Sequence, residues 1–129
     1  MGDVLSVTIL GEPVPAQMGA LLPNGRVARK GTERSRAYKH HVGLLSMLAV
    51  NRVGWSATVN ESFIVTARFF VGNARTVDAD NLCKCLLDGI KGVVFPDDRQ
   101  VVELHLYKTI ARGNPRTEVT IERIANAVG

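Results

Sequence analysis

The sequence predicts one α+β domain, in which a small mixed β-sheet of about four strands packs with two main helices. The length of 129 residues suffices for one compact domain and is short for two. Several segments alternate apolar and polar residues, which is typical of strands. Between them lie two segments whose apolar residues recur at helical spacing. A hydrophobic fraction of 46% excludes a disordered chain, and no apolar run approaches the ~18 residues that a membrane span requires.

The N-terminal half is predicted to form a strand, a long loop and a helix. Alternation of apolar residues predicts the strand at Val4–Leu10. Residues 16–34 combine several glycines with basic side chains, so we expect a loop that is mobile until it binds a ligand. The helix should extend from about Ser35, as its N-cap, to about Val53, because apolar side chains form one stripe over this range.

The C-terminal half is predicted to contain three strands and a second helix. Phe63–Val71 is apolar on both faces and is therefore expected to be a central strand. The second helix should begin at Asp80, as its N-cap, and end near Lys91. Two further strands, at Gln100–Ile110 and Thr117–Ile124, are separated by a short segment with glycine and proline, which is typical of a hairpin.

The cysteines and the N-terminal segment indicate a protein that stays in the cytoplasm. Cys83 and Cys85 are too close in sequence for an easy disulfide, and no second pair of metal ligands accompanies them, so we expect both to be reduced. The N-terminal segment alternates like a strand and lacks the basic and continuously apolar regions of a signal peptide. We therefore expect a cytoplasmic protein that does not associate with membranes.

Basic residues are concentrated between residues 24 and 41, which we call the basic segment. Its net charge is +5, whereas the whole chain has a net charge of +4, so the remainder sums to −1. The basic side chains are Arg26, Arg29, Lys30, Arg34, Arg36 and Lys39. Clustered cations bind polyanions by displacing counterions from phosphates, so this segment is either a nucleic-acid-binding surface or a solvated loop.

Two pairs of aspartates flank the second predicted helix. Asp78 and Asp80 lie at its start, and Asp97 and Asp98 follow it. Four carboxylates that met would require a cation such as Mg²⁺, which prefers oxygen ligands, and Lys84 could then contact a phosphate or orient a carboxylate. A helix that crosses between parallel strands would instead keep the two pairs apart, and each aspartate could be a cap or turn residue. Sequence spacing leaves these alternatives open.

The aspartates belong to a longer motif. It reads Asp78-x-Asp80-Asn81-Leu82-x-Lys84, then Asp88, then Asp97-Asp98-x-Gln100-Val101, and finally Lys108. The order, residue types and spacing resemble the RusA family of Holliday junction resolvases, crossover junction endodeoxyribonucleases that many phages and prophages encode. The resemblance implies that Asp78, Asp80 and Asp98 bind the metal and that Lys84 is required for cleavage. Asp97 would be a further ligand or a neighbour of one.

The same resemblance indicates where DNA would bind. Some family members carry several basic residues just before the first aspartate, where this chain has only Arg75. We therefore expect Arg75 to contribute to DNA binding and the basic segment to contribute most of it.

The resemblance also implies a reaction and an assembly. It implies a homodimer that uses Mg²⁺, with Mn²⁺ as a substitute and without a small-molecule cofactor, to nick two opposing strands of a four-way junction symmetrically during DNA recombination and repair. Two active sites related by two-fold symmetry suit a substrate with its own two-fold axis. Two other interpretations stay open, namely a branched-DNA-binding protein without catalysis and a broader nuclease that cleaves flapped or branched DNA.

Overall fold

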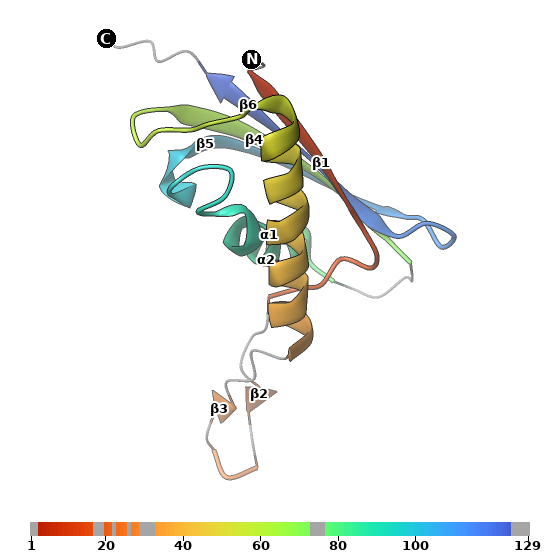
Figure 1. The fold of residues 1–129 in the computed structure, drawn as a ribbon. Helices are drawn as coiled ribbons and strands as arrows, with labels where there is room; N and C mark the ends of the chain where they lie inside the picture. The colour runs from red at the N-terminus through yellow and green to blue at the C-terminus, as the bar shows by residue number, and fades with distance from the viewer. Residues whose placement is uncertain are drawn as a thin grey trace.

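A four-stranded sheet with two helices on one of its faces forms the body of the protein in a computed structural model (Figure 1). The structure describes residues 3–16, 20–21, 23–25, 27–28, 33–72 and 77–124. The sheet contains β1 (Val4–Leu10), β4 (Ser62–Val71), β5 (Val101–Ile110) and β6 (Arg116–Ile124). The helices are α1 (Glu33–Val53) and α2 (Ala79–Ile90), and a 3₁₀ turn, η1, covers Asp98–Gln100. The predicted α+β class is confirmed.

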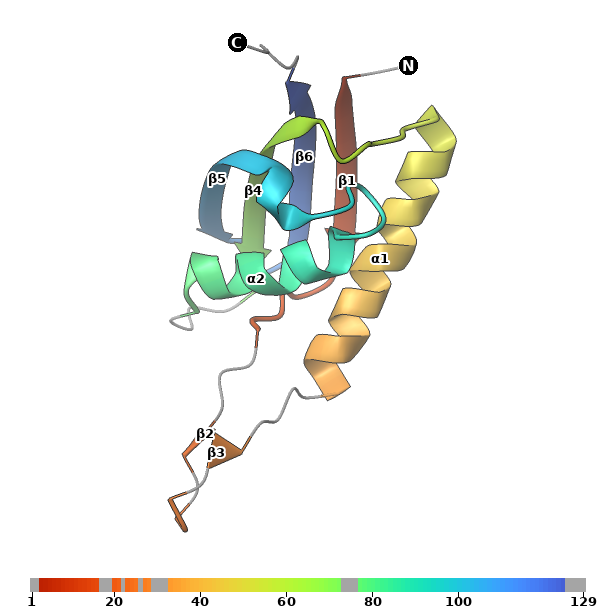
Figure 2. The same ribbon diagram turned by 90° about the vertical axis from the view of Figure 1, so that its left-hand side faces the viewer.

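The strand order of the sheet is β1-β6-β4-β5. β4 pairs with β5 in parallel and with β6 antiparallel, so α2 is a crossover connection between two parallel strands (Figure 2). The predicted central position of β4 is confirmed. The predicted hairpin between the last two strands is wrong, because β4 lies between β5 and β6. The loop after β5 passes over the end of β4, where Ala111 N–H donates to the Val71 carbonyl over 2.8 Å.

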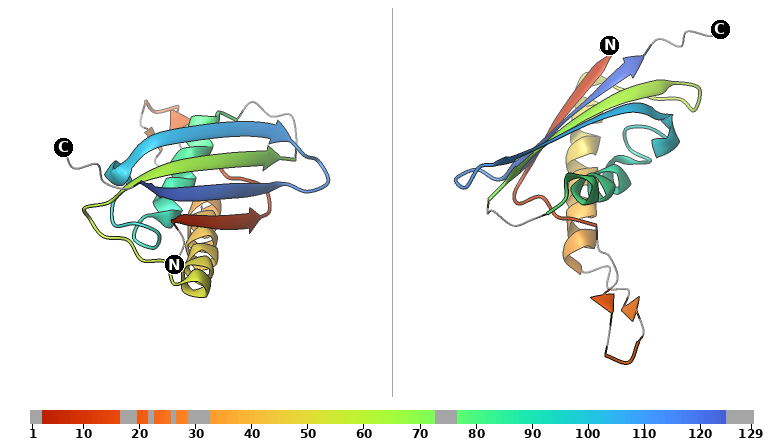
Figure 3. Two further views of the ribbon diagram at one scale, coloured as in Figure 1. Left: turned by 90° about the horizontal axis from the view of Figure 1, so that it is seen from above. Right: turned by 180° about the vertical axis from the view of Figure 1, so that it is seen from behind.

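The hydrophobic core lies between the sheet and the helices, which cover the same face (Figure 3). Alternate residues of β1, β4 and β6 point into it, as the period of a strand requires. Trp55 is buried, and its indole N–H donates to the Val94 carbonyl over 2.9 Å. Both cysteines are free and buried, and burial raises the pKa of the Cys83 thiol to about 11. In the part of the chain that the structure describes, no helix combines the length and the apolar character that a membrane span requires.

The first helix starts earlier than its sequence pattern predicts. α1 begins at Glu33, so the prediction that Ser35 is its N-cap is wrong. Ser35 is buried at the contact with α2, where the Cys85 thiol lies 3.8 Å from the Ser35 carbonyl oxygen. One turn later the Tyr38 hydroxyl lies 2.8 Å from Thr117 Oγ1, and burial raises the pKa of Tyr38 to about 12. Tertiary contacts therefore order the first turn of α1 without a cap at that serine.

The N-terminal end of α1 extends beyond the sheet, together with the short strands β2 (Ala20–Leu21) and β3 (Val27–Ala28) (Figures 1 and 2). These two strands pair antiparallel within the segment 16–34 that the sequence predicts to be a loop. Within the basic segment, β3 and the start of α1 therefore lie at the end of the molecule that extends from the sheet, whereas Tyr38 and Lys39 contact its body.

The two helices approach each other closely at Gly89 of α2. A Cβ atom at this position would lie 2.7 Å from Val42 Cγ1 and 3.1 Å from the Lys39 carbonyl oxygen, both in α1. Beside this contact, Lys39 Nζ forms an ion pair with Asp88 over 3.2 Å. Close packing at the crossing therefore requires a residue without a side chain.

We expect Gly89→Ala to lower the free energy of unfolding by about 1–2 kcal/mol. Overpacking costs about 1–3 kcal/mol, and the higher helix propensity of alanine offsets up to about 1 kcal/mol of this. Urea unfolding of the purified variant measures the change. Gly113→Ala is the matched control, because a Cβ atom there meets no heavy atom within 4 Å. Equal stability of the two variants would contradict the close approach.

Candidate active site

Asp78 and Asp80 lie at the entry of α2. Asp78 is the N-cap residue of this helix, yet its side chain makes no capping hydrogen bond. Asp80 lies in the first turn, where its Oδ1 accepts a hydrogen bond from the Asn81 N–H over 3.0 Å. The prediction that Asp80 is the N-cap is wrong, since the helix begins at Ala79. Both carboxylates are exposed, so they are accessible to a ligand.

Lys108 of β5 holds the backbone that precedes Asp78. Its Nζ donates to the Val77 carbonyl over 2.7 Å, and in the register of the sheet Lys108 lies opposite Phe69 of β4. The contact therefore ties the entry of α2 to the C-terminal part of β5. The motif includes Lys108, but spacing along the chain does not indicate this role.

Lys84 lies one turn along α2 from Asp80, on the same exposed side of the helix. The neighbouring Cys83 and Cys85 are buried, so the cation is carried by a rigidly packed helix. Asp88, one further turn along, is occupied by its ion pair with Lys39. An exposed ammonium group beside an exposed carboxylate suits contact with a phosphate.

Asp97 orders the η1 turn that precedes β5. Its Oδ1 accepts from the Arg99 backbone N–H over 3.0 Å, and its Oδ2 pairs with the Arg99 guanidinium over 2.9 Å. These hydrogen bonds hold the pKa of the Asp97 carboxyl well below its usual range. Gln100 Oε1 accepts from the Asp97 N–H over 3.0 Å and completes a capping box. Asp98 is the first residue of the turn that this network builds.

The η1 turn is anchored at the N-terminal end of β4. The amide of Gln100 donates to the carbonyls of Thr58 and Glu61 over 2.7 and 2.9 Å. A cavity of about 450 Å³ lies beside the turn. Its lining consists of Val59, Asn60, Glu61, Ser62, Asp97, Arg99 and Gln100.

A single chain does not bring the two pairs of aspartates together. Asp78 and Asp80 follow the C-terminal end of β4, whereas Asp98 precedes the N-terminal end of β5. Because β4 and β5 run in parallel, these positions lie toward opposite ends of the strand pair, on the helical side of the sheet (Figure 2). Within the described ranges, no three histidine, cysteine, aspartate or glutamate side chains are placed to hold a metal ion.

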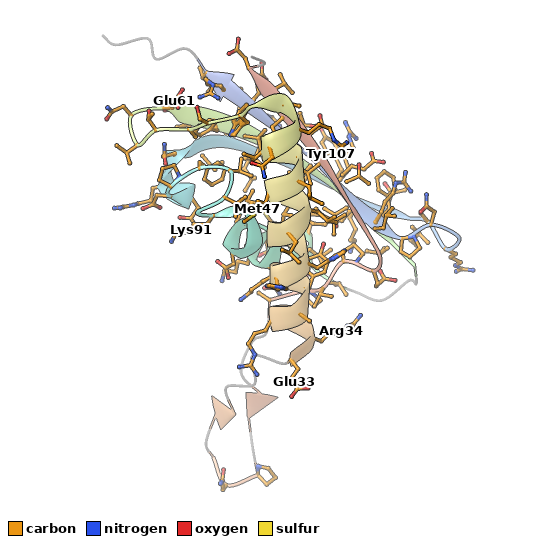
Figure 4. All side chains as sticks on the ribbon, viewed as in Figure 1. Glu33, Arg34, Met47, Glu61, Lys91 and Tyr107 are labelled. Atoms are coloured by element: carbon orange, nitrogen blue, oxygen red, sulfur yellow. The ribbon has the colours of Figure 1, made fainter. Side chains whose placement is uncertain are left out.

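The described members of the basic segment differ in their surroundings. Arg34 and Arg36 are exposed in the first turns of α1. Figure 4 shows Arg34 at the end of α1 that projects from the sheet. Lys39 is half-buried and pairs with Asp88. The other residues predicted to bind DNA lie outside the described residues, namely Arg26, Arg29, Lys30 and Arg75.

Glu12 holds the end of β4 beside the entry of α2, a role that the sequence pattern did not indicate. Its carboxylate accepts hydrogen bonds from the Gly72 N–H over 2.9 and 3.0 Å, at the end of β4. Four residues later, the Ala16 N–H donates to the Asn81 carbonyl over 3.0 Å. This stretch therefore links the end of β4 to the first turn of α2. No local pattern signals such contacts, because they join segments far apart in the sequence.

Comparison with known protein families identifies the family of this chain. A family model described as "Endodeoxyribonuclease RusA" matches residues 11–122, a range that includes the aspartates, Lys84, Lys108 and the basic segment. A search of curated proteins found no match. The matched range covers most of the chain, and the motif at α2 and η1 agrees with it. The chain therefore belongs to the RusA family of endodeoxyribonucleases.

Proposed function

We propose that this endodeoxyribonuclease resolves four-way DNA junctions by paired symmetric nicks that require Mg²⁺, or Mn²⁺ in its place. Family membership supports a junction-resolving endonuclease that acts on branched DNA. The observation that supports the rest is the entry of α2, where Asp78 and Asp80 are both exposed and Lys84, also exposed, lies one turn after Asp80. We further propose that the enzyme acts in the cytoplasm, in DNA recombination and repair.

The side chains at this entry suit a hard divalent cation. Mg²⁺ takes oxygen ligands from one or two carboxylates and completes its shell with water and phosphate oxygens. Asp78 fits this role, because its carboxylate is not used to cap α2, and Asp80 lies two residues away. When bound, the metal would activate a water molecule and stabilise the departing 3′ oxygen.

The remaining residues of the site would contact the phosphate, bind the metal or position a metal ligand. Lys84 would offset the charge that develops on the phosphate in the transition state. Asp98 would be the third metal ligand, and Asp97 would hold the turn that presents it, since both oxygens of Asp97 are occupied by Arg99. Asp97 is therefore assigned as a positioning residue.

The separation of the aspartates within one chain supports a site shared between two chains. Oxygens that share one Mg²⁺ lie about 2.1 Å from it, so ligands at opposite ends of a strand pair cannot meet on one ion. We assign Asp78 and Asp80 of one protomer and Asp98 of the other to each site. Such a homodimer contains two sites, one for each nick.

The basic segment would hold the phosphates of the junction arms. Arg34 and Arg36 are exposed at the projecting end of α1, and Arg26, Arg29, Lys30, Lys39 and Arg75 complete the set assigned to DNA. Phosphate contacts position DNA without reading its sequence, so this surface would bind branched DNA of any sequence.

The proposal is tested with labelled four-way junction, flap, duplex and single-stranded DNA, each incubated with Mg²⁺, Mn²⁺ or EDTA. We expect symmetric nicks in the junction with either metal, ligatable 5′-phosphate ends, and no cleavage in EDTA. Junction binding without cleavage in either metal would identify a non-catalytic branched-DNA-binding protein. Flap cleavage at the rate of junction cleavage would identify a broader nuclease.

A further inference from the structure

A groove lies between the outer strand β1 and the helix α1, which packs beside it. It encloses about 270 Å³. One wall is the middle of β1 and the other is the C-terminal half of α1, and the lining consists of Ser6, Val7, Thr8, Leu45, Leu48, Ala49 and Arg52. Leu48 is 59% exposed, so the apolar wall of α1 faces water. No residue that we assign to the metal or to DNA is among these lining residues.

The backbone of β1 presents hydrogen-bonding groups at the edge beside this groove. Among the described strands, β1 pairs with β6 alone. The Arg123 N–H donates to the carbonyl of the opposite residue, Asp3, over 2.7 Å, so Asp3 and every second residue after it face β6. The N–H and carbonyl groups of Ser6 and Thr8 therefore point away from β6, toward the outer side of the sheet.

β1 also lacks the residues that protect an edge strand from pairing. Its sequence, VLSVTIL, contains no charged residue and no proline, which natural edge strands use to prevent unwanted pairing. The other outer strand, β5, carries Glu103, His105 and Lys108. β1 is therefore open to the addition of an extended segment, whose side chains would alternate between the groove and the open face of the sheet.

The charges around the groove indicate the kind of segment that fits. Arg52 is the only charged residue among the lining residues, and it forms no ion pair with a carboxylate in the described part of the chain. The single acidic residue of α1, Glu33, is in its first turn, whereas Arg52 is in its last. An acidic group on an added segment would therefore meet a cation that no other group neutralises.

We propose that the groove between β1 and α1 binds an extended acidic peptide segment of another protein, which pairs with β1 as an additional strand. The segment places apolar side chains against Leu45 and Leu48 and a carboxylate at Arg52. Antiparallel pairing is the more stable arrangement, and the C-terminal end of α1 lies beside the start of β1 (Figures 1 and 2). The acidic residues are therefore expected at the C-terminal end of the bound segment.

Two other occupants fit these observations less well. A second copy of the chain offers no acidic group, because β1 is uncharged and the acid of α1 is at the far end of the helix. DNA carries negative charge, but it has neither apolar side chains to place against Leu45 and Leu48 nor a backbone that extends a sheet. Apolar lining, a free strand edge and one cation together favour a peptide.

Binding is tested by fluorescence anisotropy with three labelled octapeptides, without DNA. Each peptide alternates threonine with valine, leucine or phenylalanine over six positions and ends in two aspartates. We expect at least one peptide to bind the wild type with a Kd below about 0.1 mM. A Kd above this limit for all three peptides would overturn the proposal.

Substitution of Arg52 tests the charge pair. Arg52→Glu should bind the tightest of these peptides about tenfold more weakly than the wild type does. The same variant should prefer a peptide in which two lysines replace the two aspartates, because the signs of both partners are then reversed. A variant that keeps the wild-type preference for aspartate would show that Arg52 does not hold the acidic end.

A second pair of variants distinguishes the groove from the rest of α1. Leu48→Gln removes apolar surface from the groove wall, so we expect about fivefold weaker peptide binding. Met47→Gln is the matched control, because Met47 is 49% exposed on the same helix and is not among the lining residues. Circular dichroism checks that both variants are folded. Equal peptide affinities of the two variants would overturn the proposal.

Hydrogen exchange tests whether the peptide pairs with β1. We expect the amide protons of Ser6 and Thr8 to exchange more slowly in the complex, because their N–H groups point toward the added strand. A peptide methylated at every backbone nitrogen lacks the donors that a strand needs and should not bind. Unchanged exchange at both residues, or equal binding of the methylated peptide, would refute strand addition.

Two further measurements identify the other occupants. Junction affinity that decreases in Arg52→Glu as much as peptide affinity does would assign the groove to DNA. Sedimentation equilibrium in which Leu48→Gln dissociates a dimer of the wild type, while Met47→Gln does not, would assign the groove to a second copy. Either result would overturn the proposal. The proposed junction cleavage is measured separately, and its failure would leave peptide binding unaffected.

Discussion

Mixing two inactive variants, Asp78→Asn and Asp98→Asn, is expected to restore nicking of a four-way junction. In the proposed dimer each variant alone lacks a ligand at both sites, so we expect cleavage to fall by more than about 10³-fold. A mixed dimer combines Asp78 of one protomer with Asp98 of the other in one intact site. After subunit exchange at equal concentrations, nicking should recover to about a quarter of the wild-type rate, because half of the dimers are mixed and each has one site.

The form of the plasmid product distinguishes a dimer with one intact site from a dimer with two. A mixed dimer with one intact site should leave nicked circles from a supercoiled cruciform plasmid, whereas the wild type should produce linear molecules. Glu122→Gln removes a carboxylate from the exposed face of β6 and is the matched control, expected to cleave like the wild type. Junction binding by Asp78→Asn and Asp98→Asn should equal or exceed that of the wild type, since each change lessens repulsion of phosphates. Mixed dimers that form but do not nick would show that the site is not shared.

Neutralising Arg29, Lys30, Arg34 and Arg36 together, each to glutamine, is expected to weaken junction binding for every DNA sequence. If all four contact phosphates, the slope of log affinity against log salt concentration should decrease by roughly 3–4. Fluorescence anisotropy with a labelled junction across a series of salt concentrations measures the slope. An unchanged slope would show that these side chains are solvated surface.

A paired comparison separates the position of the charges from their number. Arg34→Gln/Arg36→Gln and Arg52→Gln/Arg112→Gln each remove two exposed positive charges, the first at the projecting end of α1 and the second elsewhere. The first double variant should reduce the salt dependence by about two units, and the second should reduce it less. Equal slopes for both would indicate that net charge alone attracts the DNA.

Most elements of the fold could be predicted from the sequence. Val4–Leu10 forms β1 as predicted, and α2 begins and ends within one residue of its predicted limits, Asp80 and Lys91. The period of apolar residues is a local property, and it persists wherever one face of an element is buried. The two predicted caps, Ser35 and Asp80, are wrong, because a cap depends on where a helix starts, and α1 begins at Glu33 and α2 at Ala79.

The sequence by itself determined the class of enzyme to which this protein belongs. The motif that contains Asp78, Asp80, Lys84 and Asp98 resembles the RusA family, and the family match agrees with the class of enzyme that this resemblance implies. Residue types and their spacing suffice to indicate the class, because they are properties of the sequence itself and do not depend on how the chain folds.

The tertiary structure decided where these side chains lie relative to one another. β4 separates β5 from β6 where a hairpin was predicted, and α2 crosses between parallel strands, so Asp78 and Asp98 lie toward opposite ends of one strand pair. The order of strands in a sheet depends on contacts between distant segments, and it minimises the apolar surface left in water. No local pattern contains that information, which is why the separation of Asp78 from Asp98 emerges from the fold and not from the motif.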